Sequence, residues 1–192
     1  MNRLHRMILA ALFTAFTCIA TMLIKIPTPT FGYIHIGDTM VLLSGIILGP
    51  GLGALAAGLG SALSDLFSGY LIWVPATFLI KALTAFVAGA LYQKILARHV
   101  GGRARAAALV LGGIIGELLM VLGYFIFEVF VAAFGSGALT RTSLYAGILS
   151  SATGIPFNLV QGVTGIILSA LLLPILVKIP ILKRSAAVHN ES

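Results

Sequence analysis

Long apolar runs broken at short turns constrain the fold of this chain more than any other feature. Two of these runs meet at Gly49-Pro50-Gly51, and a break at Ser68-Gly69-Tyr70 leads into a third. The mean hydropathy is +1.11, and only 9% of the 192 residues are charged, against about 25% in a soluble domain. We therefore expect lipid, rather than water, to surround most of this chain.

Apolar segments of this kind predict an all-α membrane protein with six transmembrane helices in a single domain, residues 1–192. A helix needs about 20 apolar residues to span a bilayer. The first segment could also be a cleaved signal peptide, but no Ala-x-Ala site precedes Lys25. Pro156 is expected to kink the last segment. The expected helices cover residues 5–26, 37–49, 51–67, 74–97, 106–133 and 148–178.

Basic residues give the orientation of the expected bundle. Six crossings place both termini on one side, and of the 12 Lys and Arg residues all but Lys25, Lys81 and Arg141 fall on that side. An excess of Lys and Arg marks the cytoplasmic face. The net charge of +7 therefore indicates orientation in a cell membrane, not nucleic-acid binding.

Polar side chains gather in the outer half of the expected bundle, whereas the inner half has no ionisable group within a segment. Such groups inside apolar helices are costly and usually functional. Helical spacing puts Thr77 and Lys81 on one face, and Tyr124 and Glu128 on another. A polar recess above a sealed apolar floor favours a binding site over a channel. The candidate binding residues are Tyr33, His35, Asp38, Asp65, Trp73, Thr77, Lys81, Tyr124, Glu128 and Asn158.

Structural roles are alternatives for several of these residues. Asp38 is placed to cap the helix that it begins. Lys81 is shallow enough to snorkel to the surface, or to pair with Asp65 on the neighbouring helix. Asn158 and Gln161 share a helix face and could bridge helices.

Enzyme, cofactor and metal motifs are missing from the sequence. Cys18 is the only cysteine, so it forms no internal disulfide and no cysteine metal cluster. Neither HExxH nor a Ser-His-Asp set is apparent, and the GxxxxGK[ST] phosphate-binding loop is missing. We expect no catalytic residue, no cofactor and no metal, although a membrane-embedded enzyme and a solute channel are weighed as less favoured alternatives.

Three stretches resemble the substrate-binding S components of energy-coupling factor (ECF) vitamin transporters: PTPTFGYIHIGD, GPGLGALAAGLGSALSD and PATFLIKAL. The resemblance covers Ala11 to about Tyr92. It implies a six-helix membrane protein with cytoplasmic termini that captures a water-soluble vitamin or precursor from outside. It also implies as partners a transmembrane coupling protein (the T component) and two ATPase subunits, which hydrolyse ATP in place of this chain.

Positions carried over from the family suggest two further roles. Ala11 and Ala15 look like the alanine motif that contacts the coupling protein, although Ile19 departs from it, and residues 27–33 look like a lid. The HIGD and GSALSD patterns resemble S components for hydroxymethylpyrimidine or pyridoxine, and also those for pantothenate and riboflavin.

A small heteroaromatic ring would suit the aromatic candidates, together with Phe157, for stacking. Asp65, Lys81, Glu128 and Asn158 would supply hydrogen bonds. An anion such as pantothenate would need Lys81 or Arg141 unpaired, and nearby carboxylates argue against it. The hydroxymethylpyrimidine or pyridoxine class is therefore preferred.

Overall fold

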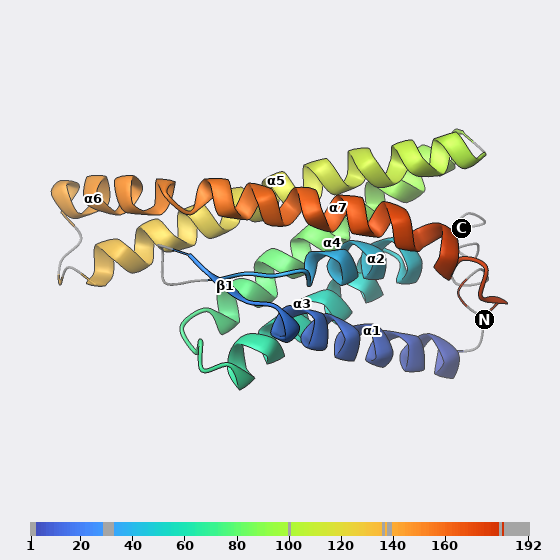
Figure 1. Ribbon diagram of the computed structural model, residues 1–192, viewed down its shortest axis with the longest axis horizontal. Helices are drawn as coiled ribbons and strands as arrows, with labels where there is room; N and C mark the ends of the chain where they lie inside the picture. Colours follow the sequence, from blue (N-terminus) through green and yellow to red (C-terminus); the bar gives the residue numbers. More distant parts are fainter. Residues whose placement is uncertain are drawn as a thin grey trace.

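The computed structural model describes residues 3–28, 33–99, 101–135, 137, 140–180 and 182, which form a helical bundle with one short hairpin (Figure 1). The hairpin pairs β1 (Ile26–Pro27) antiparallel with β2 (Tyr33–Ile34). Helix α1 begins, and α7 ends, at the same end of the bundle (Figure 1). The helices are α1 (Arg3–Leu23), α2 (Asp38–Leu48), α3 (Pro50–Phe67), α4 (Val74–Leu96), α5 (Gly102–Gly135), α6 (Arg141–Ala152) and α7 (Ile155–Leu176).

Four of these helices, namely α1, α4, α5 and α7, are long and apolar enough to cross a membrane. Their outer faces carry large exposed apolar side chains, as expected where a helix meets lipid. Helix α2 has 11 residues, about 16 Å at 1.5 Å per residue, which is shorter than a hydrocarbon core of about 30 Å. The chain is a multi-pass membrane protein, and the expected count of six crossings remains a prediction.

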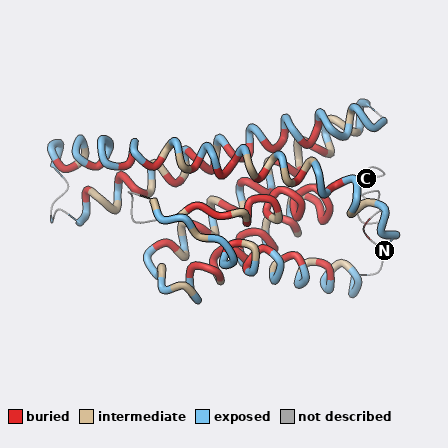
Figure 2. Tube along the Cα trace, in the orientation of Figure 1, coloured by how far each residue is buried: buried red, intermediate tan, exposed pale blue. Residues whose placement is uncertain are grey.

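Helix α2 lies at the centre of the bundle, where every residue except Met40 is buried (Figure 2). Glycine allows its backbone to touch that of α4. A Cβ added to Gly45 would lie 2.1 Å from the carbonyl oxygen of Ala85, and one added to Gly89 would lie 2.3 Å from that of Gly45. Small residues thus bring these two helices into close contact, the packing typical of membrane bundles.

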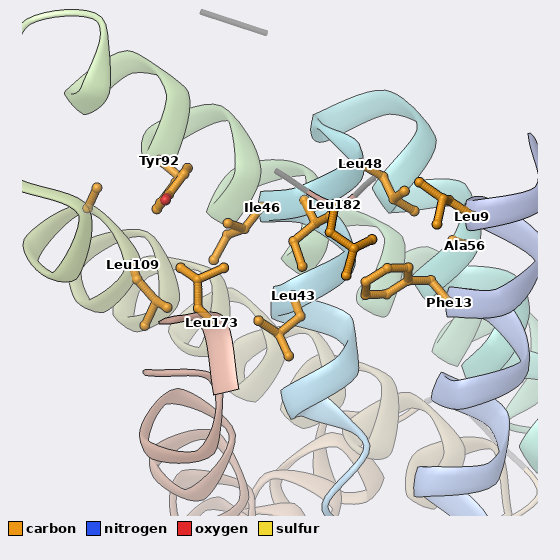
Figure 3. Packing of buried hydrophobic residues seen from close by; sticks show 12 residues of the cluster. Leu9, Phe13, Leu43, Ile46, Leu48, Ala56, Tyr92, Leu109, Leu173 and Leu182 are labelled. Atoms are coloured by element: carbon orange, nitrogen blue, oxygen red, sulfur yellow. The ribbon is translucent and has the colours of Figure 1, made fainter. Parts of the chain in front are cut away.

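An apolar cluster fills the end of the bundle where α1 begins and α7 ends (Figure 3). Leu9 and Phe13 of α1 pack there with Leu43 of α2, Leu109 of α5 and Leu173 of α7. All five side chains are at most 6% exposed. This end is sealed by hydrocarbon, and polar side chains are left for the opposite end.

Residues 148–178, which the sequence suggested as one kinked helix, are divided between α6 and α7. Pro156 lies in the first turn of α7, where its missing N–H costs no helical hydrogen bond. Helix α6 begins earlier than expected because Thr140 forms a capping box with Ser143: the Ser143 N–H donates to Thr140 Oγ1 at 3.1 Å, and the Thr140 N–H donates to Ser143 Oγ at 2.9 Å.

Candidate functional site

A small polar cavity of about 30 Å³ lies at the end of the bundle opposite the apolar cluster. A cavity of this size has room for one or two water molecules. The hairpin, helices α3, α4, α5 and α7, and the turn between α3 and α4 all contribute to its wall. The lining residues are Thr28, Tyr33, His35, Asp65, Tyr70, Trp73, Thr77, Tyr124, Glu128, Asn158 and Gln161.

Aromatic rings form two sides of this cavity. On one side the ring centroid of Trp73 lies 6.1 Å from that of Tyr124 and 5.2 Å from that of Phe127. On the other side the rings of Tyr33 and Tyr70 are 4.8 Å apart. Paired rings of this kind offer flat apolar surfaces on which a planar ligand can stack.

The hydroxyl groups of Tyr33 and Tyr124 donate hydrogen bonds to polar side chains. Tyr33 Oη donates to Asp65 Oδ1 at 2.6 Å, and Tyr124 Oη donates to Thr77 Oγ1 at 3.2 Å. Burial, followed by the negative charge of Asp65, raises the pKa of the Tyr33 hydroxyl. Tyr33 therefore stays a donor and ties the hairpin to the end of α3.

A buried chain of hydrogen bonds forms the floor of the cavity. The backbone N–H of His35 donates to Gln161 Oε1 at 2.8 Å, and Gln161 Nε2 donates to Asp38 Oδ2 at 2.7 Å. The other carboxylate oxygen of Asp38 forms an ion pair with Lys81, and both side chains are fully buried. The floor thus connects the hairpin, α2, α4 and α7, and within it the carboxylate of Asp38 compensates the positive charge of Lys81.

Lys25, which follows α1, lies beside two of the tyrosines that line the cavity. Its Nζ donates to Ser68 Oγ. The same atom lies 4.6 Å from the ring centroid of Tyr33 and 5.9 Å from that of Tyr70. Lys25 thus bridges the hairpin and the α3–α4 turn. We call Lys25, Tyr33, Ser68 and Tyr70 the Lys25 cluster.

Most of the candidate binding residues line the cavity, but Asp38 and Lys81 do not, and they belong to the buried network of the floor. Lys81 pairs with Asp38, not with Asp65. Asp38 does not cap α2, because Gly37 occupies the cap position and no side chain bonds there. Phe157 and Arg141 are not among the lining residues. Residues 29–32 of the suggested lid lie outside the described residues.

Sequence reasoning did not select three of the lining residues, Thr28, Tyr70 and Gln161. Gln161 is placed one helical turn after Asn158, a signal that could have found it. Tyr70 belongs to the break at Ser68-Gly69-Tyr70, and Thr28 to the suggested lid, residues 27–33, but the sequence assigned neither of them a ligand contact. No group of three or more His, Cys, Asp or Glu residues in the described part of the chain could hold a metal ion.

A second hollow, an open apolar groove of about 680 Å³, runs between α1 and α3. Ala11 and Ala15 are exposed within it. Its other lining residues are Met7, Ala10, Thr14, Cys18, Ile19, Leu52, Leu55, Ala56, Leu59, Leu63 and Phe67.

Comparison with known proteins defines the class. The family model described as "ECF-type riboflavin transporter, S component" matches residues 1–178, so the chain belongs to that family. Its family and fold are those of a transporter S component, not of an enzyme.

Two similar proteins illustrate the relationship. A protein of Pyrococcus woesei described as "Uncharacterized protein in gap 3'region" is 33% identical over 159 residues, 82% of this chain and 97% of that protein. A solved structure, described as "Structure and mechanism of the S component of a bacterial ECF transporter", superposes with a TM-score of 0.63 at 18% identity. The superposition covers 92% of this chain and 98% of the chain in that structure.

Proposed function

We propose that this chain is the substrate-capture subunit of an ECF importer. In this proposal it takes up a small, uncharged heteroaromatic vitamin or precursor of the hydroxymethylpyrimidine or pyridoxine class from outside the cell. Its ligand contacts are the candidate residues that line the cavity, with Gln161 and Tyr70 added.

The observation that carries this proposal is the chemistry of the cavity wall. The wall combines paired aromatic rings with the carboxylates of Asp65 and Glu128. Lys81, the cation nearest the floor, is already paired with Asp38. None of the described lining residues is a lysine or an arginine. A ligand carboxylate or phosphate would therefore meet like charge, which supports an uncharged ring over pantothenate.

The size of the cavity also bears on the ligand class. At about 30 Å³ it is too small for a vitamin, so the residues around it, including the Lys25 cluster, must shift before a vitamin enters. A single pyrimidine or pyridine ring requires a smaller shift than a three-ring flavin. Riboflavin is nevertheless the second candidate, because the description of the family names it.

Membrane placement and partners complete the proposal. The chain crosses the cell membrane six times, with both termini in the cytoplasm. A T component and two ATPase subunits provide the energy, because the sequence lacks a GxxxxGK[ST] loop. The groove at Ala11 and Ala15 receives the T component, since small exposed residues let another helix approach closely.

Calorimetry on the purified chain in detergent tests the proposal. The ligands are hydroxymethylpyrimidine, pyridoxine, thiamin, riboflavin and pantothenate. We expect tight binding of one of the first two and no binding of pantothenate. Binding of riboflavin alone would favour the second candidate, and no binding of any member would overturn the proposal.

Matched variants locate the site in the same assay. Asn158→Ala and Tyr124→Phe should weaken binding by about tenfold, because each removes a polar group from the wall. Tyr145→Phe is the control, since Tyr145 is 69% exposed on α6 and does not line the cavity. Equal affinities for Tyr124→Phe and Tyr145→Phe would remove Tyr124 from the site.

A further inference from the structure

The imidazole ring of His35 is held in one orientation at the cavity wall. Its Nδ1 accepts a hydrogen bond from the backbone N–H of Gly37 at 3.0 Å. Its own backbone N–H is held by Gln161, and its ring centroid lies 5.5 Å from that of Tyr33. The ring therefore cannot turn over without breaking the contact with Gly37.

Gly37 is required for this arrangement. A Cβ at that position would lie 2.8 Å from His35 Nδ1 and 2.1 Å from Thr21 Oγ1. No side chain fits there, so the turn before α2 closes directly onto the ring. Gly37 thus restricts the imidazole of His35 to one orientation.

This contact determines which nitrogen carries the proton. A ring nitrogen that accepts from an N–H group has no hydrogen of its own, and a neutral imidazole has a single N–H. The proton therefore sits on Nε2, across the ring from Gly37. No hydrogen bond to Nε2 is formed within the described ranges, and the ring lines the cavity.

The surroundings keep the ring neutral. His35 lies in the linker between β2 and α2 and is only 9% exposed. Burial, followed by the positive charge of Lys81 on α4, lowers its pKa to about 3, against the opposing charge of Asp38 on α2. Lys25, beyond α1, acts in the same direction as Lys81. Asp65 on α3 and Glu128 on α5 line the same cavity.

We propose that His35 is a specificity-determining residue whose Nε2–H is a fixed donor for an acceptor atom of the ligand. This inference rests on the proposed function, and it narrows the ligand class. The carboxylate of Asp65 accepts hydrogen bonds in the same cavity. The ligand is therefore a heteroaromatic ring that carries a ring nitrogen or carbonyl oxygen for His35 and an amino, imide or hydroxyl group for Asp65.

Two substitutions with uncharged side chains of similar shape distinguish the roles of Nδ1 and Nε2 of His35. In His35→Gln the side-chain amide reaches the position of Nε2 and keeps a donor there. In His35→Asn the amide reaches only the position of Nδ1, so the contact with Gly37 is kept and the donor to the cavity is lost. Both variants are uncharged, and each is checked for folding by its thermal unfolding midpoint.

The measurement compares two probes by calorimetry: hydroxymethylpyrimidine and its analogue with C–H in place of both ring nitrogens. We expect wild type and His35→Gln to prefer the pyrimidine by about tenfold, the effect of one unmade hydrogen bond in a buried site. The preference should fall to near unity in His35→Asn. An equal preference in all three proteins would overturn the role of His35 and leave the proposed function standing. If wild type binds neither hydroxymethylpyrimidine nor any other member of the panel, both fail.

Nitrogen NMR on wild-type protein with labelled histidine observes the protonation of the His35 ring directly. The chain has four histidines, and the signals missing in His35→Gln identify His35. We expect a neutral ring protonated on Nε2, with the Nε2 resonance shifting when hydroxymethylpyrimidine is added. A ring protonated on Nδ1, or an Nε2 resonance that the bound probe leaves unmoved, would overturn the proposal.

Discussion

Lys81 and Asp38 form a fully buried ion pair between α4 and the first residue of α2. The pair does not line the cavity, and Gln161 connects it to the cavity wall. Two charges in this position stabilise the arrangement of helices only while both are present, because an unpaired charge in the interior has no compensating solvent.

Removal of one partner should therefore destabilise the protein strongly. Lys81→Met leaves Asp38 unpaired, and we expect a loss of about 3–5 kcal/mol, seen as a lower thermal unfolding midpoint in detergent. This structural role differs from the ligand-binding role that the sequence alone suggested for Lys81. The double variant Lys81→Met/Asp38→Leu should recover part of the loss, and an unchanged midpoint for Lys81→Met would contradict the structural role.

The contact between α2 and α4 should not tolerate a single added methyl group. Gly45→Ala and Gly89→Ala each place a Cβ within 2.3 Å of a backbone oxygen of the other helix, so the helices must separate. We expect lower unfolding midpoints and reduced yield of folded protein. Gly51→Ala is the control, since nothing lies within 4 Å of its added Cβ, and it should behave as wild type.

The Lys25 cluster should control how fast a ligand leaves. Tyr33→Phe removes the hydrogen bond to Asp65, and Lys25→Met removes the cation from the rings of Tyr33 and Tyr70. We expect ligand dissociation to be about tenfold faster for Tyr33→Phe and a few-fold faster for Lys25→Met. Stopped-flow measurement with the ligand found by calorimetry checks this, and Lys94→Met, on the exposed surface near the end of α4, should dissociate at the wild-type rate.

Acid should destabilise the folded protein partly through His35. Its pKa is lowered from 6.5 to about 3, so above pH 6.5 the ring is neutral in both states and contributes nothing. Below pH 6.5 only the unfolded chain takes up the proton, and stability falls by about 1.4 kcal/mol per pH unit until the pH approaches the folded pKa. The unfolding midpoint of wild type should therefore drop more than that of His35→Gln between about pH 7 and about pH 5. The exposed His99 provides the control variant His99→Gln, and parallel curves for wild type and His35→Gln would contradict the prediction.

The groove between α1 and α3 should be needed for transport and not for binding. Ala15→Trp fills the groove with an indole ring, and we expect the isolated chain to bind its ligand normally while vitamin uptake by the assembled transporter is lost. Uptake in cells that express the complex measures this. Ala146→Trp is matched to it, since Ala146 is also exposed, but on α6. Normal uptake by Ala15→Trp would show that this groove does not receive the T component.

Local patterns predicted much of the candidate site. The spacing of Thr77, Tyr124 and Glu128 within apolar helices gave both their faces and their approximate depths, and all three line the cavity. Helix ends were harder, because the capping box of Thr140 and the place of Pro156 in a first turn depend on single residues. Gln161 was assigned only to helix packing, although it also reaches the cavity.

The sequence by itself determined that this chain lies in a membrane, that its helices are apolar, and that its polar groups gather toward one end. Those properties follow from hydropathy and from the helical period, which neighbouring residues establish among themselves. Only the tertiary structure decided that Lys81 meets Asp38 and not Asp65, and that His35 turns its Nε2 away from Gly37. Such pairings join segments far apart in the chain, and a difference of one helical turn in depth is enough to exchange one partner for another.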